Sequence, residues 1–141
     1  MKQLLTDASA LIAYLVSEED GHDQIVEFLT IQRVQCITTG PALAEAMHML
    51  RKLQGYPGQE ALWGLRTIGL MEIAKPNWDR SEALMNQYND VPMDLADATL
   101  VALAEQLNQD IILTLDDDFF IYQIQRGHNA KPFVVVPSVK N

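Results

Sequence analysis

The stretch DLADATLVALAEQLNQDIILTLDDD, residues 94–118, decides the fold class of this chain. From Thr99 onward its apolar residues recur at the spacing of one helical face, which predicts an amphipathic helix. The residues expected on the buried side of this helix are Leu100, Leu103, Ala104 and Leu107. The segment 111–115 that follows is nearly all apolar, which is typical of a strand covered on both faces in a parallel sheet. The stretch therefore predicts an α/β fold.

The same alternation of helical and extended patterns runs through the rest of the sequence. Strands are expected at residues 3–7, 34–39, 71–76, 111–115 and 131–137. Further helices are expected at residues 9–16, 22–32, 41–54, 59–70 and 77–90. Asn77 is expected to cap the last of these, and GYPG at 55–58 to form a turn. This order predicts a three-layer α/β/α sandwich with a mainly parallel central sheet of about five strands, in a single domain over residues 1–141.

The composition is that of an ordinary soluble globular protein, with 48% hydrophobic and 21% charged residues. No apolar run approaches the roughly 20 residues of a membrane span, and no signal-peptide cleavage site is evident, so we expect a cytoplasmic protein. Cys36 is the only cysteine, which excludes an intrachain disulfide and a cysteine metal cluster. The net charge of −9 argues against a protein that holds nucleic acid by broad charge neutralisation. It does not exclude an enzyme acting on nucleic acid, because a bound cation would cancel part of the local charge.

A subset of the acidic residues lies at the ends of strands and the starts of helices. Asp7 ends the first strand, and the three aspartates at 116–118 follow the fourth. Glu45 lies in the first turns of the helix after the second strand, and Asp94 and Asp97 share one face of a helix start. Because the carboxyl ends of parallel strands line a common crevice, we expect these acids to converge on one edge of the sheet.

Each of these acids also has an ordinary structural explanation. Asp94 is a good helix N-cap, Asp97 gains from the helix dipole, and Asp7 suits a turn or cap. Glu45 could lie on a solvated helix face, and at least one member of the run 116–118 should face solvent. It would nevertheless be an unusual coincidence for acids at four such positions around one sheet to be four independent caps. Their placement therefore favours a shared site.

A shared site of carboxylates favours metal chemistry. Unpaired carboxylates repel one another, and a hard divalent cation such as Mg²⁺ or Mn²⁺ removes this repulsion with oxygen ligands. Such an ion can activate a water and stabilise the charge that develops on a phosphodiester. Such chemistry needs no serine, cysteine or histidine nucleophile, and the sequence agrees, since it contains no G-x-S-x-G, P-loop, G-x-G-x-x-G or H-E-x-x-H motif.

Four stretches resemble the acidic motifs of PIN domains, in the family's order and over nearly the whole chain. They are LLTDASALIAYL at 4–15, TTGPALAEAMHML at 38–50, DLADATLVALAEQL at 94–107 and ILTLDDDF at 112–119. The size and layout are most similar to the VapC-type toxins of bacterial and archaeal toxin–antitoxin pairs. This resemblance implies a ribonuclease that depends on Mg²⁺ or Mn²⁺.

The resemblance also implies which residues form the catalytic site. Asp7, Glu45 and Asp97 match the three acids that define the family site. The fourth acid is either Asp116, which follows the Thr-Leu pair as in many relatives, or Asp118, which precedes a phenylalanine.

Three further residues match positions that support the family site. Ser9 and Thr114 correspond to positions that often carry a polar group near the acids. Asp94 lies where many relatives have serine or another polar residue, so it could be an additional outer group or only the helix cap.

The mechanistic hypothesis that follows gives each acid a role. Asp7, Asp97 and Asp116 are expected to hold the metal directly or through water, and Glu45 to help position the metal or the attacking water. Attack in line on phosphorus would leave a 5′-phosphate and a 3′-hydroxyl.

The resemblance further implies a homodimer and an antitoxin partner that inserts a peptide with a basic residue into the acidic groove. The alternative is a non-catalytic module that binds RNA or a basic peptide there, and metal-dependent cleavage of RNA would distinguish the two. A receiver-like or phosphohydrolase domain is disfavoured, because the expected strand at 71–76 lacks a phospho-acceptor aspartate and no D-x-D-x-T motif is present.

Overall fold

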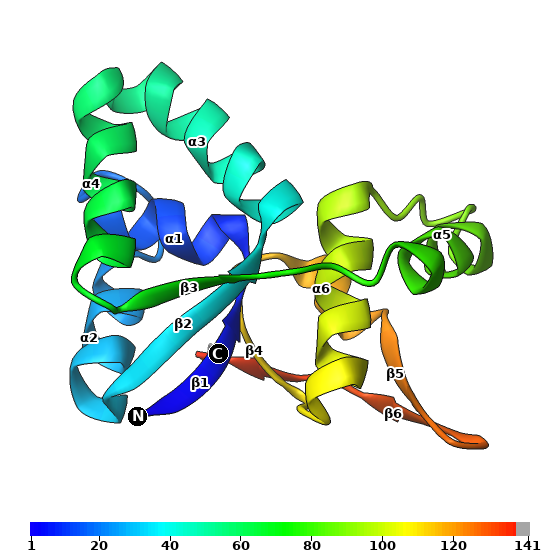
Figure 1. Cartoon of the computed structure of the whole chain (residues 1–141). Helices are drawn as coiled ribbons and strands as arrows, with labels where there is room; N and C mark the ends of the chain where they lie inside the picture. The colour runs from blue at the N-terminus through cyan, green and yellow to red at the C-terminus, as the bar shows by residue number, and fades with distance from the viewer. Residues whose placement is uncertain (138–141) are drawn as a thin grey trace.

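A five-stranded parallel sheet forms the centre of the molecule (Figure 1). The computed structural model describes residues 1–137, and residues 138–141 of the expected single domain lie outside this range. In spatial order the strands are β3 (Met71–Ala74), β2 (Val34–Thr39), β1 (Lys2–Thr6), β4 (Ile111–Leu113) and β7 (Val134–Val136). Every neighbouring pair in this sheet is parallel. The predicted parallel sheet of about five strands is therefore confirmed.

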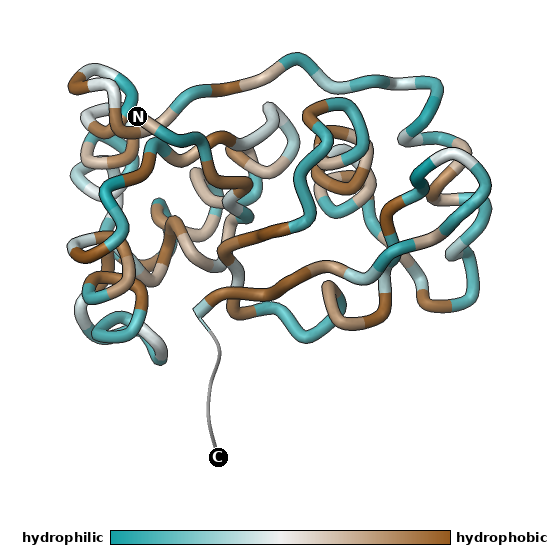
Figure 2. The backbone as a smooth tube through the Cα atoms, turned by 90° about the horizontal axis from the view of Figure 1, so that it is seen from below, coloured by the Kyte–Doolittle hydropathy of each residue, from teal (hydrophilic) through white to brown (hydrophobic). Residues whose placement is uncertain are grey.

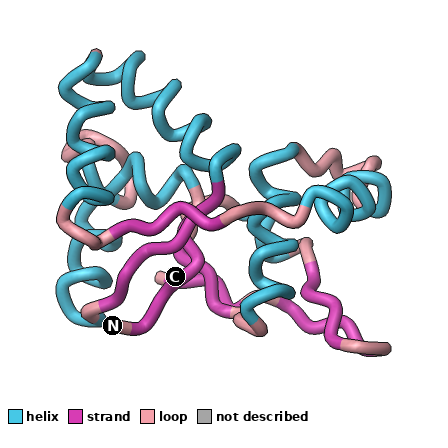
Figure 3. Tube along the Cα trace, viewed as in Figure 1, coloured by secondary structure: helices cyan, strands magenta, loops and turns pink. Residues whose placement is uncertain are grey.

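Helices cover both faces of the sheet, as Figures 1 and 3 show. One group consists of α1 (Ala8–Leu15), α2 (His22–Gln32), α3 (Gly40–Gln54) and α4 (Tyr56–Thr67), and the other of α5 (Trp78–Gln87) and α6 (Leu95–Leu107). Hydrophobic and hydrophilic residues alternate in short stretches along these helices (Figure 2), as expected for elements with one buried side. No helix within residues 1–137 has the length and apolarity needed to cross a membrane. The predicted three-layer sandwich is confirmed.

Successive strand residues pack into opposite cores. On β1, Leu4 packs with α1 and α2, whereas Leu5 packs with α6. On β4, Leu113 faces the α1–α2 side and Ile112 the α6 side. Because side chains alternate across a sheet, a strand buried on both faces must be apolar at nearly every position, as the sequence showed.

The end of the chain differs from the sequence-based prediction. Residues 131–137 were expected to form one strand, but Lys131 and Pro132 belong to β6 (Asn129–Pro132), which pairs antiparallel with β5 (Gln123–Arg126). Only β7 joins the central sheet. The hairpin escaped prediction because its two strands are largely exposed and polar, which leaves no apolar alternation to detect.

Two other boundaries also differ from the prediction. The expected turn at 55–58 contracts to Gly55, whose φ of 70° ends α3, while Pro57 lies in the first turn of α4. Proline at that position already has the φ of a helix and needs no hydrogen-bond partner for its nitrogen. The fourth strand stops at Leu113 rather than residue 115, because the chain turns away toward a short 3₁₀ helix at Asp117–Phe120.

The strand order creates a switch point between β1 and β4. From β1 the chain builds outward to β2 and β3, and β4 returns to the opposite side of β1 before β7 is added. In open parallel sheets, ligands bind at the carboxyl ends of the strands where the order reverses. Here those ends carry Asp7 after β1 and Asp116 after β4.

Candidate active site

Asp7 forms the hydrogen-bonded base of the site. It follows β1 and caps α1, with Oδ1 accepting from the Ala10 amide at 3.3 Å and from the Ser9 hydroxyl at 2.6 Å. Oδ2 accepts from the Thr114 hydroxyl at 2.7 Å. The side chain is only 4% exposed, and burial raises the pKa of Asp7 although these hydrogen bonds oppose the shift.

Ser9 and Thr114 also connect the two neighbouring strand ends. The Ser9 hydroxyl accepts a hydrogen bond from the Leu115 amide at 2.9 Å, and the Thr114 hydroxyl accepts one from the Asp116 amide at 2.9 Å. Both hydroxyls therefore donate a hydrogen bond to Asp7 and accept one from a backbone amide that follows β4. The network fixes the direction in which the chain leaves β4, and with it the position of Asp116.

Asp97 lies in the first turn of α6 and is 8% exposed. Its Oδ2 accepts a hydrogen bond from the Tyr122 hydroxyl at 2.9 Å. Burial, followed by the neighbouring charges of Asp94, Asp116 and Asp7, raises the pKa of Asp97 to about 7. A cation bound at this carboxylate would offset both the cost of its burial and the repulsion from the neighbouring charges.

Asp94 is the N-cap residue of α6, as expected, but its side chain does not cap the helix. Asp94 occupies the N-cap position of α6 with extended backbone, but its side chain makes no capping hydrogen bond and is exposed. Its charge instead contributes to the raised pKa values of Asp97, Glu45 and Asp116. The Asp94 carbonyl accepts a hydrogen bond from the Ala98 amide at 3.0 Å, whereas its side chain belongs to the acidic surroundings of the site.

Asp97, Asp116 and Asp118 each offer a carboxylate oxygen, and these three atoms lie within 4.8 Å of one another. The turn after β4 brings the last two together, because Asp116 Oδ1 accepts from the Asp118 amide at 2.9 Å. Asp117 is exposed between them and is not a member of this cluster. Burial first, and then the charges of neighbouring acids, raise the pKa of Asp116. We call these three residues the acidic cluster.

Glu45 and Asp7 border the acidic cluster without belonging to it. Glu45 is the more exposed of the two and lies on α3, the helix that follows β2. Partial burial, and then the charges of Asp94, Asp7 and Asp116, raise its pKa. Glu45 is therefore near enough to these acids for their charges to affect its carboxylate.

The chemistry of the acidic cluster fits a hard divalent cation. Among residues 1–137 the ion pairs are Arg80 with Glu105 at 2.6 Å and Lys131 with Asp110 at 2.7 Å, so no basic side chain neutralises the cluster. Carboxylate oxygens are the ligands that Mg²⁺ and Mn²⁺ prefer. A hollow of about 400 Å³ lies beside the cluster and is lined by Thr114 and Asp116 among others.

Tyr122 is a site residue that the sequence analysis missed. It lies between the 3₁₀ helix and β5, in a segment for which the sequence predicted no structure. Nothing in its local spacing indicates a contact with Asp97, which lies 25 residues earlier. Only the pairing of the β5–β6 hairpin and its packing on α6 could have revealed it.

The raised pKa of Asp97 predicts how stability depends on pH. Its folded pKa of about 7 lies above the unfolded value near 3.9, so the folded state binds the proton more tightly. The free energy of unfolding of the metal-free protein should therefore fall as the pH rises from about 4 to about 7. Urea unfolding across this range measures the effect, and Asp97→Asn should make the decline shallower. An equally steep decline in Asp97→Asn would contradict the assignment of this shift to Asp97.

Comparisons with known proteins support the same fold. The family model described as PIN domain matches residues 4–124. Ribonuclease VapC26 of Mycobacterium tuberculosis is 26% identical over 142 residues, covering 95% of this chain and 100% of the relative. The crystal structure of M. tuberculosis VapC20, described as a Sarcin-Ricin loop cleaving toxin, superposes with a TM-score of 0.74 at 16% identity, covering 82% of this chain and 91% of that one.

A second solved structure, PAE2754 from Pyrobaculum aerophilum, has a TM-score of 0.60 at 15% identity and covers 96% of this chain and 90% of its own. At these identities the two structures support the fold alone. The family model covers most of the chain, including the segments that hold all the acids described above. The resemblance read from the four motifs is thus confirmed, and the chain belongs to the PIN domain family.

Proposed function

We propose that this chain is an endoribonuclease that cleaves RNA phosphodiester bonds with Mg²⁺ or Mn²⁺ held by its carboxylates. The observation that carries the proposal is the acidic cluster, three carboxylate oxygens within 4.8 Å of one another. Its place at the switch point of the sheet and the similarity to Ribonuclease VapC26 support the same conclusion.

The residues of the site divide into metal ligands and groups that shape the site. Asp97, Asp116 and Asp118 would hold the ion directly, since their oxygens are already close together. Asp7 would act through water, because both of its oxygens already accept hydrogen bonds from Ser9 and Thr114. When bound, the ion would supply an activated water and stabilise negative charge on the phosphate.

Glu45 is proposed to take up the proton that the attacking water loses. Its carboxylate is accessible from solvent, and its raised pKa makes it a better proton acceptor than an ordinary glutamate. The pair Ser9 and Thr114 would keep Asp7 and Asp116 aligned during the reaction. Attack in line would give a 5′-phosphate and a 3′-hydroxyl.

Substitutions in the run 116–118 should separate the metal ligands from the solvated acid. Asp116→Asn and Asp118→Asn should each lower cleavage by at least about 10-fold, because each removes a charged oxygen ligand and the loss of an outer group alone typically costs a metal site that much. Asp117→Asn is the matched control, and its rate should remain that of the unmodified chain. Initial cleavage rates at fixed Mg²⁺ measure the effect. A larger loss in Asp117→Asn than in Asp118→Asn would contradict the proposed ligand set.

The proposed activity is tested by incubating the purified chain with total bacterial RNA and with intact ribosomes. Ribosomes are included because the structurally similar VapC20 is described as cleaving the Sarcin-Ricin loop. We expect new 5′-phosphate ends with Mg²⁺, none with EDTA, and recovery after Mn²⁺ is added. RNA binding without any metal-dependent cleavage would instead favour the non-catalytic interaction module.

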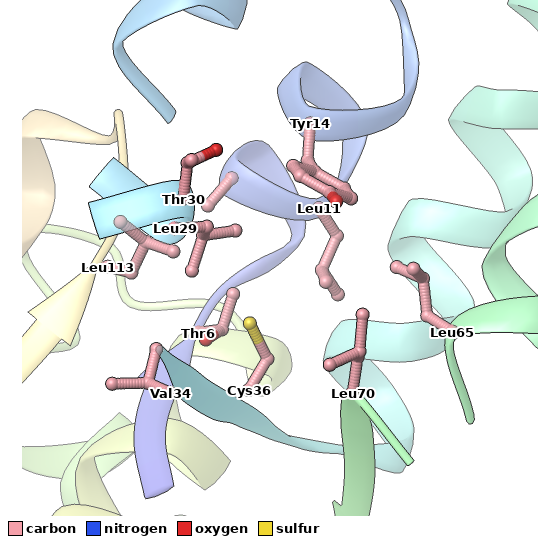
Figure 4. Close-up of a pocket in the computed structure, with 11 residues that line it drawn as sticks. Thr6, Leu11, Tyr14, Leu29, Thr30, Val34, Cys36, Leu65, Leu70 and Leu113 are labelled. Atoms are coloured by element: carbon pink, nitrogen blue, oxygen red, sulfur yellow. The ribbon is translucent and has the colours of Figure 1, made fainter. Parts of the chain in front are cut away.

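We also propose that the chain acts in the cytoplasm as a homodimer and as the toxin of a toxin–antitoxin pair. A mainly apolar pocket of about 140 Å³ lies between α1, α2, α4 and the sheet, and Figure 4 shows Leu11, Leu29 and Leu65 in its wall. An apolar segment of an antitoxin could occupy it. Expression of the chain alone should arrest growth, and co-expression with the product of an adjacent gene should relieve the arrest. Harmless expression of the intact chain would count against a toxin.

A further inference from the structure

Tyr122 is among the largest fully buried side chains, and its hydroxyl reaches the Asp97 carboxylate. The O–H donates to Oδ2 of Asp97 at 2.9 Å. Among the side-chain hydrogen bonds formed within residues 1–137, this is the one that involves the Asp97 carboxylate. A buried hydroxyl needs a partner, but this partner is also a member of the acidic cluster.

The aromatic ring of Tyr122 is held from two sides. Its centroid lies 5.2 Å from that of Tyr88 and 5.3 Å from that of Phe119, with interplanar angles of 69° and 88°. Phe119 in turn packs edge-on against Phe133, with centroids 5.6 Å apart. Such edge-to-face contacts fix the orientation of a ring more strictly than general apolar packing does. The hydroxyl therefore has a defined direction.

The backbone of Tyr122 is tied to a second member of the acidic cluster. Its amide donates to the carbonyl oxygen of Asp118 at 3.3 Å, and the preceding Ile121 amide donates to the same oxygen at 2.9 Å. One residue thus contacts Asp118 through its backbone and Asp97 through its side chain. A shift of Tyr122 would disturb the separation of these two acids.

We propose that Tyr122 is a positioning residue, which orients Asp97 so that its second carboxylate oxygen faces Asp116 and Asp118, the other two members of the acidic cluster. This inference rests on the proposed function, since it requires the acidic cluster to bind a divalent ion. Hydrogen bonds from outer groups orient the ligands of metal sites, and their loss typically weakens metal binding by about 10- to 100-fold. The hydroxyl of Tyr122 is placed to act in this way, whereas its ring serves the core.

Tyr122→Phe removes only the hydroxyl, and Tyr88→Phe is its matched control. Tyr88 packs on the same ring, and its hydroxyl accepts from the Gln123 amide at 2.9 Å, away from Asp97. Mn²⁺ affinity of the full chain is measured by electron paramagnetic resonance at a temperature where circular dichroism shows all three proteins folded. Cleavage of RNA is measured in parallel over a range of Mn²⁺ concentrations.

We expect Tyr122→Phe to weaken Mn²⁺ binding by about 10- to 100-fold and Tyr88→Phe to leave it unchanged. High Mn²⁺ should restore cleavage by Tyr122→Phe, a rescue that a purely structural lesion would not show. Equal Mn²⁺ affinity in Tyr122→Phe and the unmodified chain, or an equal loss in Tyr88→Phe, would overturn the inference while leaving the proposed function intact. Failure of the unmodified chain to bind Mn²⁺ would overturn both.

Discussion

Asp97→Asn should lower the rate of metal-dependent RNA cleavage by about 100- to 1000-fold while leaving the chain folded. The substitution keeps the size of the side chain and one oxygen that can accept from the Tyr122 hydroxyl, but removes a negative charge from the acidic cluster. Loss of a preorganised charged group at a reacting phosphate typically costs about 100- to 1000-fold in rate. Initial rates at saturating Mg²⁺ measure the loss, and circular dichroism checks the fold.

Asp79→Asn provides the matched control for this experiment. Asp79 is an exposed aspartate in the first turn of α5, as Asp97 is in the first turn of α6, so both variants lose the same interaction with a helix dipole. Cleavage by Asp79→Asn should equal that of the unmodified chain. Normal cleavage by Asp97→Asn would remove this residue from the site.

The second large effect is expected for substitutions of Asp7, which should change the stability of the fold and the cleavage activity to different degrees. Asp7→Ala removes a helix cap, which costs about 0.5–2 kcal/mol, and deprives the buried Thr114 hydroxyl and the half-buried Ser9 hydroxyl of their acceptor, which costs about 1–3 kcal/mol more. The free energy of unfolding should therefore fall markedly. Asp7→Asn retains an acceptor oxygen, so it should destabilise the fold much less, yet it should lose cleavage as well. Urea unfolding and initial rates measure the two effects.

Asn77→Ala isolates the contribution of capping. Asn77 caps α5 by accepting from the Arg80 amide at 3.0 Å, but it is exposed and lies outside the site. Asn77→Ala should cost only about 1 kcal/mol and retain full cleavage. If Asp7→Ala were no more destabilising than Asn77→Ala, the hydrogen-bond network around Asp7 would not have the energetic importance assigned to it.

The helices and strands that were predicted well from the sequence are those whose residue pattern depends on burial or on the residues next to them in the chain. The second strand matches its prediction residue for residue at Val34–Thr39, and Asn77 caps its helix as expected. The β5–β6 hairpin was missed because its strands are stabilised by pairing with each other, and their exposed polar residues give no periodic signal. The local pattern of apolar residues gives no information about pairing between distant or polar segments.

In the site, too, some residues could be predicted from their place in the sequence, whereas others could be found only from the three-dimensional structure. Asp7, Asp97 and Asp116 could be proposed because they follow strands or begin a helix. Whether Asp116 or Asp118 faces the other acids depends on the turn after β4, and the structure places both in the acidic cluster. The contact of Tyr122 depends on the packing of side chains from separate elements.

The most direct test of the central claim is anomalous diffraction from crystals of this chain soaked in Mn²⁺. The claim is that the acidic cluster of Asp97, Asp116 and Asp118 binds the divalent ion used in RNA cleavage. We expect an anomalous peak about 2 Å from their carboxylate oxygens, as in other Mg²⁺-type sites. Absence of a peak there, at a Mn²⁺ concentration that supports cleavage, would contradict the claim.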